Sequence, residues 1–395
     1  MALYPVPAPG YNGINQNLFP FKVASDVFKE WVQITPLFNL MGNEPTRPIV
    51  RKKLGQREGL QYRMGKLQAL DYKNPVVNFD QRRGNAQQQR VDYDSVNVDF
   101  KSFLVQIKGY DILNYGTPVD LPPYARTQLV EAFSRALNRD LFLAATTGAY
   151  PRMTNALANC NVADVLPSYD RAVLSGLSPT AAEYYANATF PAKFNAANPA
   201  HTHNGLSATH LKNLKLTAER GGTSINREDA IQPAYVRSKA GWPMNKYIYL
   251  AHPESLTSLF ADPLFSQSTF NRGTVIDAEN TPQTLNGADY VGEFFGISIY
   301  SCKDLYEFEF TSAANNHRMA WNLFIGAGAW SLGWAEEPML GMENDLVERI
   351  QLYFGHEFRG QKMLKFASQR NAADAARNLA TSVEQGILHS FVAIQ

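Results

Sequence analysis

The stretch that most constrains the fold is a long helical pattern between Asp120 and Gly148. Asp120 can cap this helix, and Pro122 and Pro123 lie in its first turn, where a missing N–H group costs nothing. Small and apolar residues recur at three- and four-residue steps and form one stripe: Ala125, Leu129, Ala132, Phe133, Ala136, Leu137, Leu141 and Ala144. About 25 residues at 1.5 Å each predict a rod of roughly 38 Å. One helix of this length among strand and loop patterns indicates a spine.

The residues before this helix alternate in a way that predicts a long β-strand over 91–108. The alternation slips near 101–102, which is typical of a β-bulge. Two later strands, at 346–358 and 362–366 with a tight turn between them, need a sheet to join. We expect them to join the strand at 91–108 in one sheet, packed on the apolar stripe of the helix.

Residues 47–90 form the most basic part of the chain. They hold eleven Lys and Arg residues against three Asp and Glu residues, a net charge of about +8 in a chain whose formal net charge is +1. Apolar residues are too sparse there to close a core, and glycines interrupt the strand-like pieces. The pattern therefore predicts a long β-hairpin that leaves the body. It is either a solvated basic loop or an arm that docks on an acidic surface of another copy.

The second interpretation defines a set of residues for contacts between subunits. The acidic side comes from a patch late in the chain, which is otherwise a solvated face. The candidates are Arg51, Lys52, Lys53, Arg57, Arg63, Lys66, Arg82 and Arg83 on the basic side, and Glu336, Glu337, Glu343 and Asp345 on the acidic side.

The remaining segments have weaker patterns. Residues 1–20 are rich in Pro, Gly, Asn and Tyr and predict an extended arm. Strands and helices mix over 205–335, which indicates one compact α/β unit, with 294–300 (FFGISIY) as a buried strand. The Ala-rich stretch 369–386 predicts a helix, and 390–395 a short apolar tail.

Composition excludes several classes of protein. A net charge of +1 is too small for an electrostatic nucleic-acid binder, and two cysteines are too few for a disulfide framework or a Cys-based zinc site. The first residues lack the basic start and apolar run of a signal peptide, and no stretch has 18 apolar residues, so we expect neither a leader nor a membrane span. The charged fraction of 18% suits either large buried interfaces or a modestly soluble monomer.

Motifs for catalysis or phosphate binding are missing from the sequence. It has no GxGxxG after a strand, no GxxxxGK[ST] loop and no GxSxG elbow. The histidines His201, His203 and His210 form the one cluster that could hold a metal or serve an enzyme. Solvent-exposed loop histidines are the plainer interpretation, so we expect no metal site and no cofactor.

The order of these parts, over about residues 20–368, resembles a tailed-phage major capsid protein with the HK97-type fold, and more narrowly the coat proteins of N4-like phages. The resemblance is carried by RTQLVEAFSRALNRDLFLAATTG, KYIYLAHPESLTSLFADPLF, GEFFGISIYSC, NLFIGAGAWSLGWAEEPML and ERIQLYFGHEFRGQKMLKF, in this order. It implies an α+β fold that begins with an N-terminal arm and short helix at 1–46 and an extended hairpin (E-loop) at 47–95. A peripheral domain would follow at 96–150 and 340–368, with the spine helix at 121–147. Between its two parts would lie an axial domain at 151–339, with an Ala/Asn-rich insertion at 150–205, and the chain would end in a C-terminal tail at 369–395.

The resemblance also implies a function. Copies would assemble as hexamers and pentamers into an icosahedral shell around double-stranded DNA, without enzymatic activity. The partners would be other copies, a portal protein, any scaffolding or decoration proteins, and DNA by non-specific contact. The protein would be part of the capsid shell of virions, which assemble in the host cytoplasm, and it would have no membrane partner. The alternatives are an encapsulin-like nanocompartment, which shares the fold, and an unrecognised enzyme using His201, His203 and His210.

Overall fold

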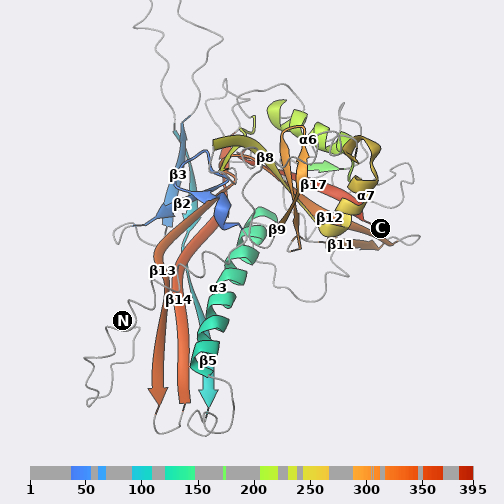
Figure 1. The fold of residues 1–395 in the computed structure, drawn as a ribbon. Helices are drawn as coiled ribbons and strands as arrows, with labels where there is room; N and C mark the ends of the chain where they lie inside the picture. Colours follow the sequence, from blue (N-terminus) through green and yellow to red (C-terminus); the bar gives the residue numbers. More distant parts are fainter. Residues whose placement is uncertain are drawn as a thin grey trace, which may run out of the picture.

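The computed structural model is organised around two large sheets and one long helix, with two further two-stranded sheets (Figure 1). It describes residues 37–54, 61–67, 91–108, 121–146, 172–174, 205–220, 230–237, 243–266, 288–303, 305, 307–311, 316–345, 350–367 and 382–394. A long peripheral sheet lies beside helix α3, and an axial sheet with helices α6 and α7 lies at one end of it (Figure 1). The predicted mixture of strands and a few helices is thus present.

The peripheral sheet has five strands in the order β1-β2-β13-β14-β5. Their bounds are β1 Met41–Gly42, β2 Ile49–Lys53, β5 Asp99–Lys108, β13 Trp330–Asp345 and β14 Ile350–Met363. Strand β14 pairs antiparallel with both β13 and β5, so the later part of the chain does return to the strand before the helix, as predicted. Strand β13 was not expected here, because residues up to 339 were assigned to the axial domain.

Helix α3, Leu121–Thr146, confirms the predicted spine. Leu129, Phe133, Leu137 and Leu141 are buried along its apolar stripe. Phe133 packs edge-on against Phe103 of β5, with ring centroids 4.9 Å apart. None of the helices in the described ranges combines the length and the apolar content needed to cross a membrane.

The axial sheet has eight strands, six of them in the order β6-β17-β12-β8-β10-β9, with β11 beside β12 and β7 beside β8. The strands are β6 Ala172–Leu174, β7 Ala234–Arg237, β8 Pro243–Ala251, β9 Ala288–Phe294, β10 Ile297–Cys302, β11 Glu307–Thr311, β12 Asn316–Ile325 and β17 Ile387–Ile394. The helices are α6, Ala208–Arg220, and α7, Pro253–Ala261. The prediction for 294–300 was wrong in part, because β9 ends at Phe294 and the chain turns before β10.

The end of the sequence is a core strand, which corrects the predicted tail. Strand β17 lies between β12 and β6, and the side chains of Ile387, Leu388, Phe391 and Val392 are fully buried. A nearly continuous apolar run is typical of a strand covered on both faces. The helix predicted over 369–386 is wrong at its end, where β16, Ser382–Glu384, pairs with β15, Lys365–Ala367. Residues 369–381 lie outside the described part.

The basic segment forms a hairpin that starts later than predicted. Strands β3, Gln61–Leu67, and β4, Val91–Asn97, pair antiparallel over seven residues, and 68–90 lie outside the described residues. Strand β2 instead joins the peripheral sheet. The predicted bulge at 101–102 is wrong, because the β5–β14 ladder runs unbroken and the chain changes sheets at Val98.

Gly360 lies at a second position where the structure differs from the prediction made from the sequence. A tight turn was predicted between two late strands, yet β14 continues through this residue. A Cβ atom added at Gly360 would lie 2.2 Å from the carbonyl oxygen of Asn97. The glycine is therefore needed because the chain leaving the hairpin passes against the sheet at this point.

Candidate assembly surfaces

The hairpin is fixed to the body at its root. Tyr62 and Ser331 share a hydrogen bond of 2.9 Å between their hydroxyl groups, and burial raises the pKa of Tyr62. The buried Asp94 accepts from Lys362 Nζ at 2.5 Å and from the backbone N–H of Lys365 at 3.0 Å. Leu54, Tyr62, Val96 and Val98 form a small core beneath these bonds. The root is therefore rigid, and the arm leaves the body in a defined direction.

Three of the predicted basic contact residues lie on β2 and have partners in their own chain. Arg51 and Lys53 reach Glu337 Oε1 at 3.0 and 3.3 Å. The Arg51 guanidinium also lies 4.9 Å from the Trp334 ring centroid, and Lys52 Nζ lies 5.7 Å from that of Tyr62. These contacts follow from the parallel pairing of β2 with β13, which puts alternate cations beside one carboxylate. They stabilise the sheet within one copy.

Two of the other basic candidates, Arg63 and Lys66, lie on β3. Arg63 is exposed on β3, and Lys66 donates to Gln385 at 2.6 Å. Arg57, Arg82 and Arg83 fall outside the described residues. The arm therefore still carries charge that its root does not use.

The acidic candidates divide along β13. Glu337 forms ion pairs with Arg51 and Lys53 of β2, whereas Glu336 lies 3.9 Å from His356 Nε2 on β14. Glu343 is exposed farther along the strand, and Asp345 is its last residue. The structure thus separates an inner carboxylate, which holds the sheet, from an outer acidic end. A contact of that end with another copy remains a prediction.

A buried charge cluster clamps α3 to the peripheral sheet. Arg359 of β14 contacts Asp140 of α3 at 2.6 Å and Glu357 at 2.8 Å, and Lys101 of β5 also contacts Asp140. Trp334 Nε1 donates to Glu357 at 3.3 Å. Burial raises the pKa of Glu357, and the positive charge of Arg359 opposes that shift. Because the cluster joins three strands and the helix, it fixes the spine against the sheet.

His210 is a core residue, which corrects the expectation of exposed loop histidines. It lies on α6, and its Nε2 atom is 2.8 Å from the Ser390 hydroxyl of β17. That hydroxyl is 3.0 Å from Tyr249 of β8, whose hydroxyl accepts from Asn322 of β12 at 3.0 Å. Burial lowers the pKa of His210 to about 4, so the ring is neutral near pH 7.

The surroundings of His210 exclude it as an accessible catalytic base. Ser390 is fully buried, so no substrate can reach the pair. His201 and His203 lie outside the described residues. Among the described residues, no group of three or more His, Cys, Asp or Glu side chains is placed to hold a metal ion.

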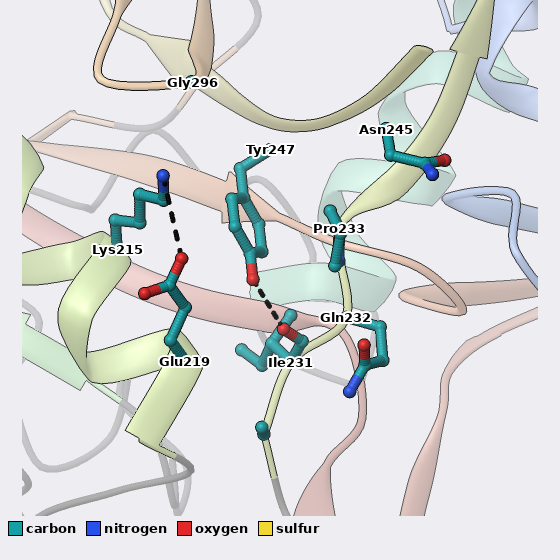
Figure 2. A pocket seen from close by; sticks show the side chains of 9 residues that line it. Lys215, Glu219, Ile231, Gln232, Pro233, Asn245, Tyr247 and Gly296 are labelled. Carbon is teal, nitrogen blue, oxygen red and sulfur yellow. Dashed lines mark hydrogen bonds and ion pairs between the residues drawn. The ribbon is translucent and has the colours of Figure 1, made fainter. Parts of the chain in front are cut away.

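A shallow pocket lies between α6 and β8 (Figure 2). Lys215 and Glu219 of α6 form an ion pair of 3.6 Å on one side, and Tyr247 donates to the carbonyl oxygen of Ile231 at 2.8 Å on the other. Gly296, in the turn between β9 and β10, borders it.

Large apolar side chains are exposed on several of the described parts of the molecule. The hairpin exposes Val91 and Tyr93, the peripheral sheet exposes Phe100, Leu104 and Met342, and the axial domain exposes Phe260, Leu264 and Phe295. Where such groups gather in one patch, they mark a surface that another protein can cover. An alternating strand pattern does not identify them, because it shows which residues share a face but not which face stays exposed. For Phe295, the sequence does contain one signal: it lies in a Phe-Phe-Gly stretch, and the glycine of that stretch can form a turn.

No protein-family model and no curated protein matches the sequence. Solved structures do match at full length. The capsid of Ralstonia phage GP4 is 15% identical over 90% of both chains, with a TM-score of 0.63. The acid-stable capsid of Helicobacter pylori bacteriophage KHP30 is 10% identical over 91% of both, with a TM-score of 0.62. The cyanophage Pam1 capsid is 14% identical over 92% of this chain and 93% of that one, with a TM-score of 0.61. The chain therefore has the fold of these phage capsid proteins, as the resemblance predicted.

Proposed function

We propose that this chain is the major capsid protein of a tailed phage. Copies assemble as hexamers and pentamers into an icosahedral shell that encloses double-stranded DNA, and the protein has a structural role without enzymatic activity. The observation that carries the proposal is the shared fold over about nine-tenths of both chains.

The exposed apolar groups support assembly. A chain with bare aromatic and aliphatic residues on its hairpin, peripheral sheet and axial domain is poorly suited to remain a monomer. Contacts between different surfaces of identical copies close into rings, as a shell requires.

The proposal also has finer parts. These are a portal protein and any scaffolding or decoration protein as partners, and a relationship to N4-like phages.

The basic arm supplies one of the proposed contacts. Its root is bonded to its own chain through Tyr62 and Asp94, and β3 and β4 extend from the peripheral sheet (Figure 1). We place its charges, including the exposed Arg63, against the outer acidic end of β13 in a neighbouring copy. Charge pairs of this kind set register and orientation more than affinity.

The experiment compares the full chain with a variant whose arm is shortened. Residues 68–90 are replaced by Asn-Gly, which favours a two-residue hairpin turn and keeps the root bonds. Particles are scored by electron microscopy and sedimentation, and folding by circular dichroism and thermal unfolding. We expect shells from the full chain, and from the variant a folded body that forms none.

Two controls make the outcome decisive. Lys362→Ala in the full chain removes two root bonds, to Asp94 and to the carbonyl oxygen of Ser95, but leaves the arm, so it separates weakening of the root from loss of the arm. A full chain that stays monomeric under all conditions, in the presence of its scaffolding protein if it has one, contradicts the capsid proposal. Normal shells from the shortened chain contradict only the role of the arm.

A further inference from the structure

The turn between β9 and β10 has an unfavourable residue at its tip. Phe294 pairs with Ile297, so the loop consists of Phe295 and Gly296 alone. Their φ angles are 51° and 76°, and Phe295 is the one described residue other than glycine with a positive φ. Turns that need two positive φ values favour Asn-Gly, because a bulky side chain is strained in this region. A phenylalanine here therefore costs stability.

A cation from the neighbouring helix holds the strained residue in place. Lys215 Nζ of α6 donates to the carbonyl oxygen of Phe295 at 2.9 Å. The same ammonium group lies 4.4 Å from the centroid of the Phe295 ring. Glu219, one turn later, orients Lys215 through their ion pair (Figure 2). The turn is thus fixed so that the ring stands at the surface, where it gains little from burial within the chain.

Two further large apolar side chains of the axial domain are exposed. Phe260 at the end of α7 and Leu264 just after it are 57% and 59% exposed, and Phe295 is 45% exposed. A row of aromatic contacts runs from Phe260 through the buried Phe265 and the partly buried Phe294 to Phe295, with centroid separations of 6.1, 6.1 and 6.5 Å, and Leu264 directly precedes Phe265 in the chain. We call Phe260, Leu264 and Phe295 the axial patch. Helix α7 lies on the side of the axial domain away from the peripheral sheet (Figure 1).

We infer that the axial patch is a contact surface for a second copy of this chain, an inference that rests on the proposed function. Backbone strain at a residue whose side chain stays about half exposed is typical of a residue kept for contact or chemistry. The three members of the patch are uncharged, so it does not suit DNA phosphates. The pocket beside Gly296 adjoins it and can receive a side chain of the neighbouring copy.

The size of the patch favours a repeated contact between copies over a separate partner. At roughly 200 Å² for each large side chain, its exposed apolar area is on the order of 300 Å². A stable complex of two proteins buries about 800 Å² on each. A contact too small to hold two proteins alone becomes effective when each copy makes several in a closed assembly.

The test is Phe295→Asn in the full chain. Asparagine adopts a positive φ more readily, so the variant should unfold at a temperature about 2 °C higher or more. Its yield of particles should fall about tenfold or more relative to the unchanged chain, as for loss of a contact hot spot. Stability and assembly then change in opposite directions, which misfolding cannot produce.

A second variant and a control complete the experiment. Phe260→Ser with Leu264→Ser removes the rest of the patch and should reduce particles similarly, whereas Ala261→Ser, at an exposed position of the same helix, should leave the yield unchanged. Normal yields from Phe295→Asn and from the double variant overturn the inference while the proposed function stands. A lower unfolding temperature for Phe295→Asn overturns the argument from strain. If the unchanged chain forms no particles, the proposed function fails and this inference fails with it.

Discussion

At the scale of single residues, stability depends on a few buried polar groups more than on the many surface charges. Arg359 is fully buried between Asp140 and Glu357, and its loss would leave the buried Glu357 without its contacting cation while Asp140 keeps Lys101. Removing one partner of a buried ion pair is costly because the remaining charge stays away from water. Exposed pairs contribute far less.

Arg359→Met should therefore lower the free energy of unfolding at pH 7 by about 3–5 kcal/mol. The matched control is Arg135→Met on α3, which removes an exposed i,i+4 pair with Glu131 and should change stability by about 0.5 kcal/mol or less. Urea unfolding of both variants measures the difference. Equal losses from the two substitutions would contradict the clamp.

His210 gives the axial domain a predictable response to acid. Its pKa is lowered by burial to about 4, whereas an unfolded histidine binds a proton near pH 6.5. Between these values the unfolded chain binds more protons, so stability falls as the pH is lowered through this window. At about 1.4 kcal/mol for each pKa unit, the loss from this residue approaches roughly 3 kcal/mol at pH 4.

His210→Gln should lower stability at pH 7, because the bonds to Ser390 change, but it should flatten the decline toward pH 4. Urea unfolding at pH 7, 6, 5 and 4.5 measures the slope of each protein. His389, whose pKa burial lowers to about 3, keeps part of the slope in the variant. Identical slopes would show that His210 does not stay neutral in the fold.

At the scale of elements, local patterns predicted the long helix α3 well and the choice of strand partners poorly. The stripe from Leu129 to Leu141 specifies α3 by itself, because a helix satisfies its backbone locally. Strand β13 needs β2 and β14 as partners, and no periodicity within 330–345 identifies them. The same limit applied to β17, which was predicted to be a tail.

Ending the chain after Gly386 should unfold the axial domain. The truncation removes five buried apolar side chains of β17, each contributing about 2 kcal/mol, a total comparable with the stability of a whole domain. It also leaves β12 and β6 without their shared partner. Circular dichroism and limited proteolysis test the result, with Phe391→Ala as a milder comparison at about 3–5 kcal/mol. A protease-resistant axial domain in the truncated chain would contradict this view of β17.

Among the candidate contact residues, the sequence identified charge but not its use. Arg51, Lys53 and Glu337 were predicted for contacts between copies, and the fold brings them together inside one copy. A contact between copies and a contact within one copy require the same charge pattern in the sequence. Only the pairing of β2 with β13 distinguishes the two. Phe295 could not be identified at all, because its exposure and its φ angle depend on a turn set by the ladder of β9 and β10.

At the scale of the whole molecule, the two sheets are built from parts of the chain that lie far apart. The peripheral sheet takes strands from both sides of β6–β12, and the chain crosses between the two sheets three times: after α3, at the turn through Gly328, and between β15 and β17. Three covalent crossings hold the domains together more firmly than a single linker would. This arrangement suits a subunit whose surfaces must keep fixed positions in a lattice of copies.

The pairing of β2 with β13 also sets the order in which the chain can fold. Arg51 and Glu337 are 286 residues apart, so this edge of the sheet cannot close until the intervening chain has collapsed. Contacts of such high sequence separation form late and slowly, because closing the loop costs entropy before any contact compensates it. Until then β2 has the short strand β1 as its partner in the sheet. We therefore expect the arm to gain its fixed direction late in folding, so that contacts through the arm form only after the body of the subunit.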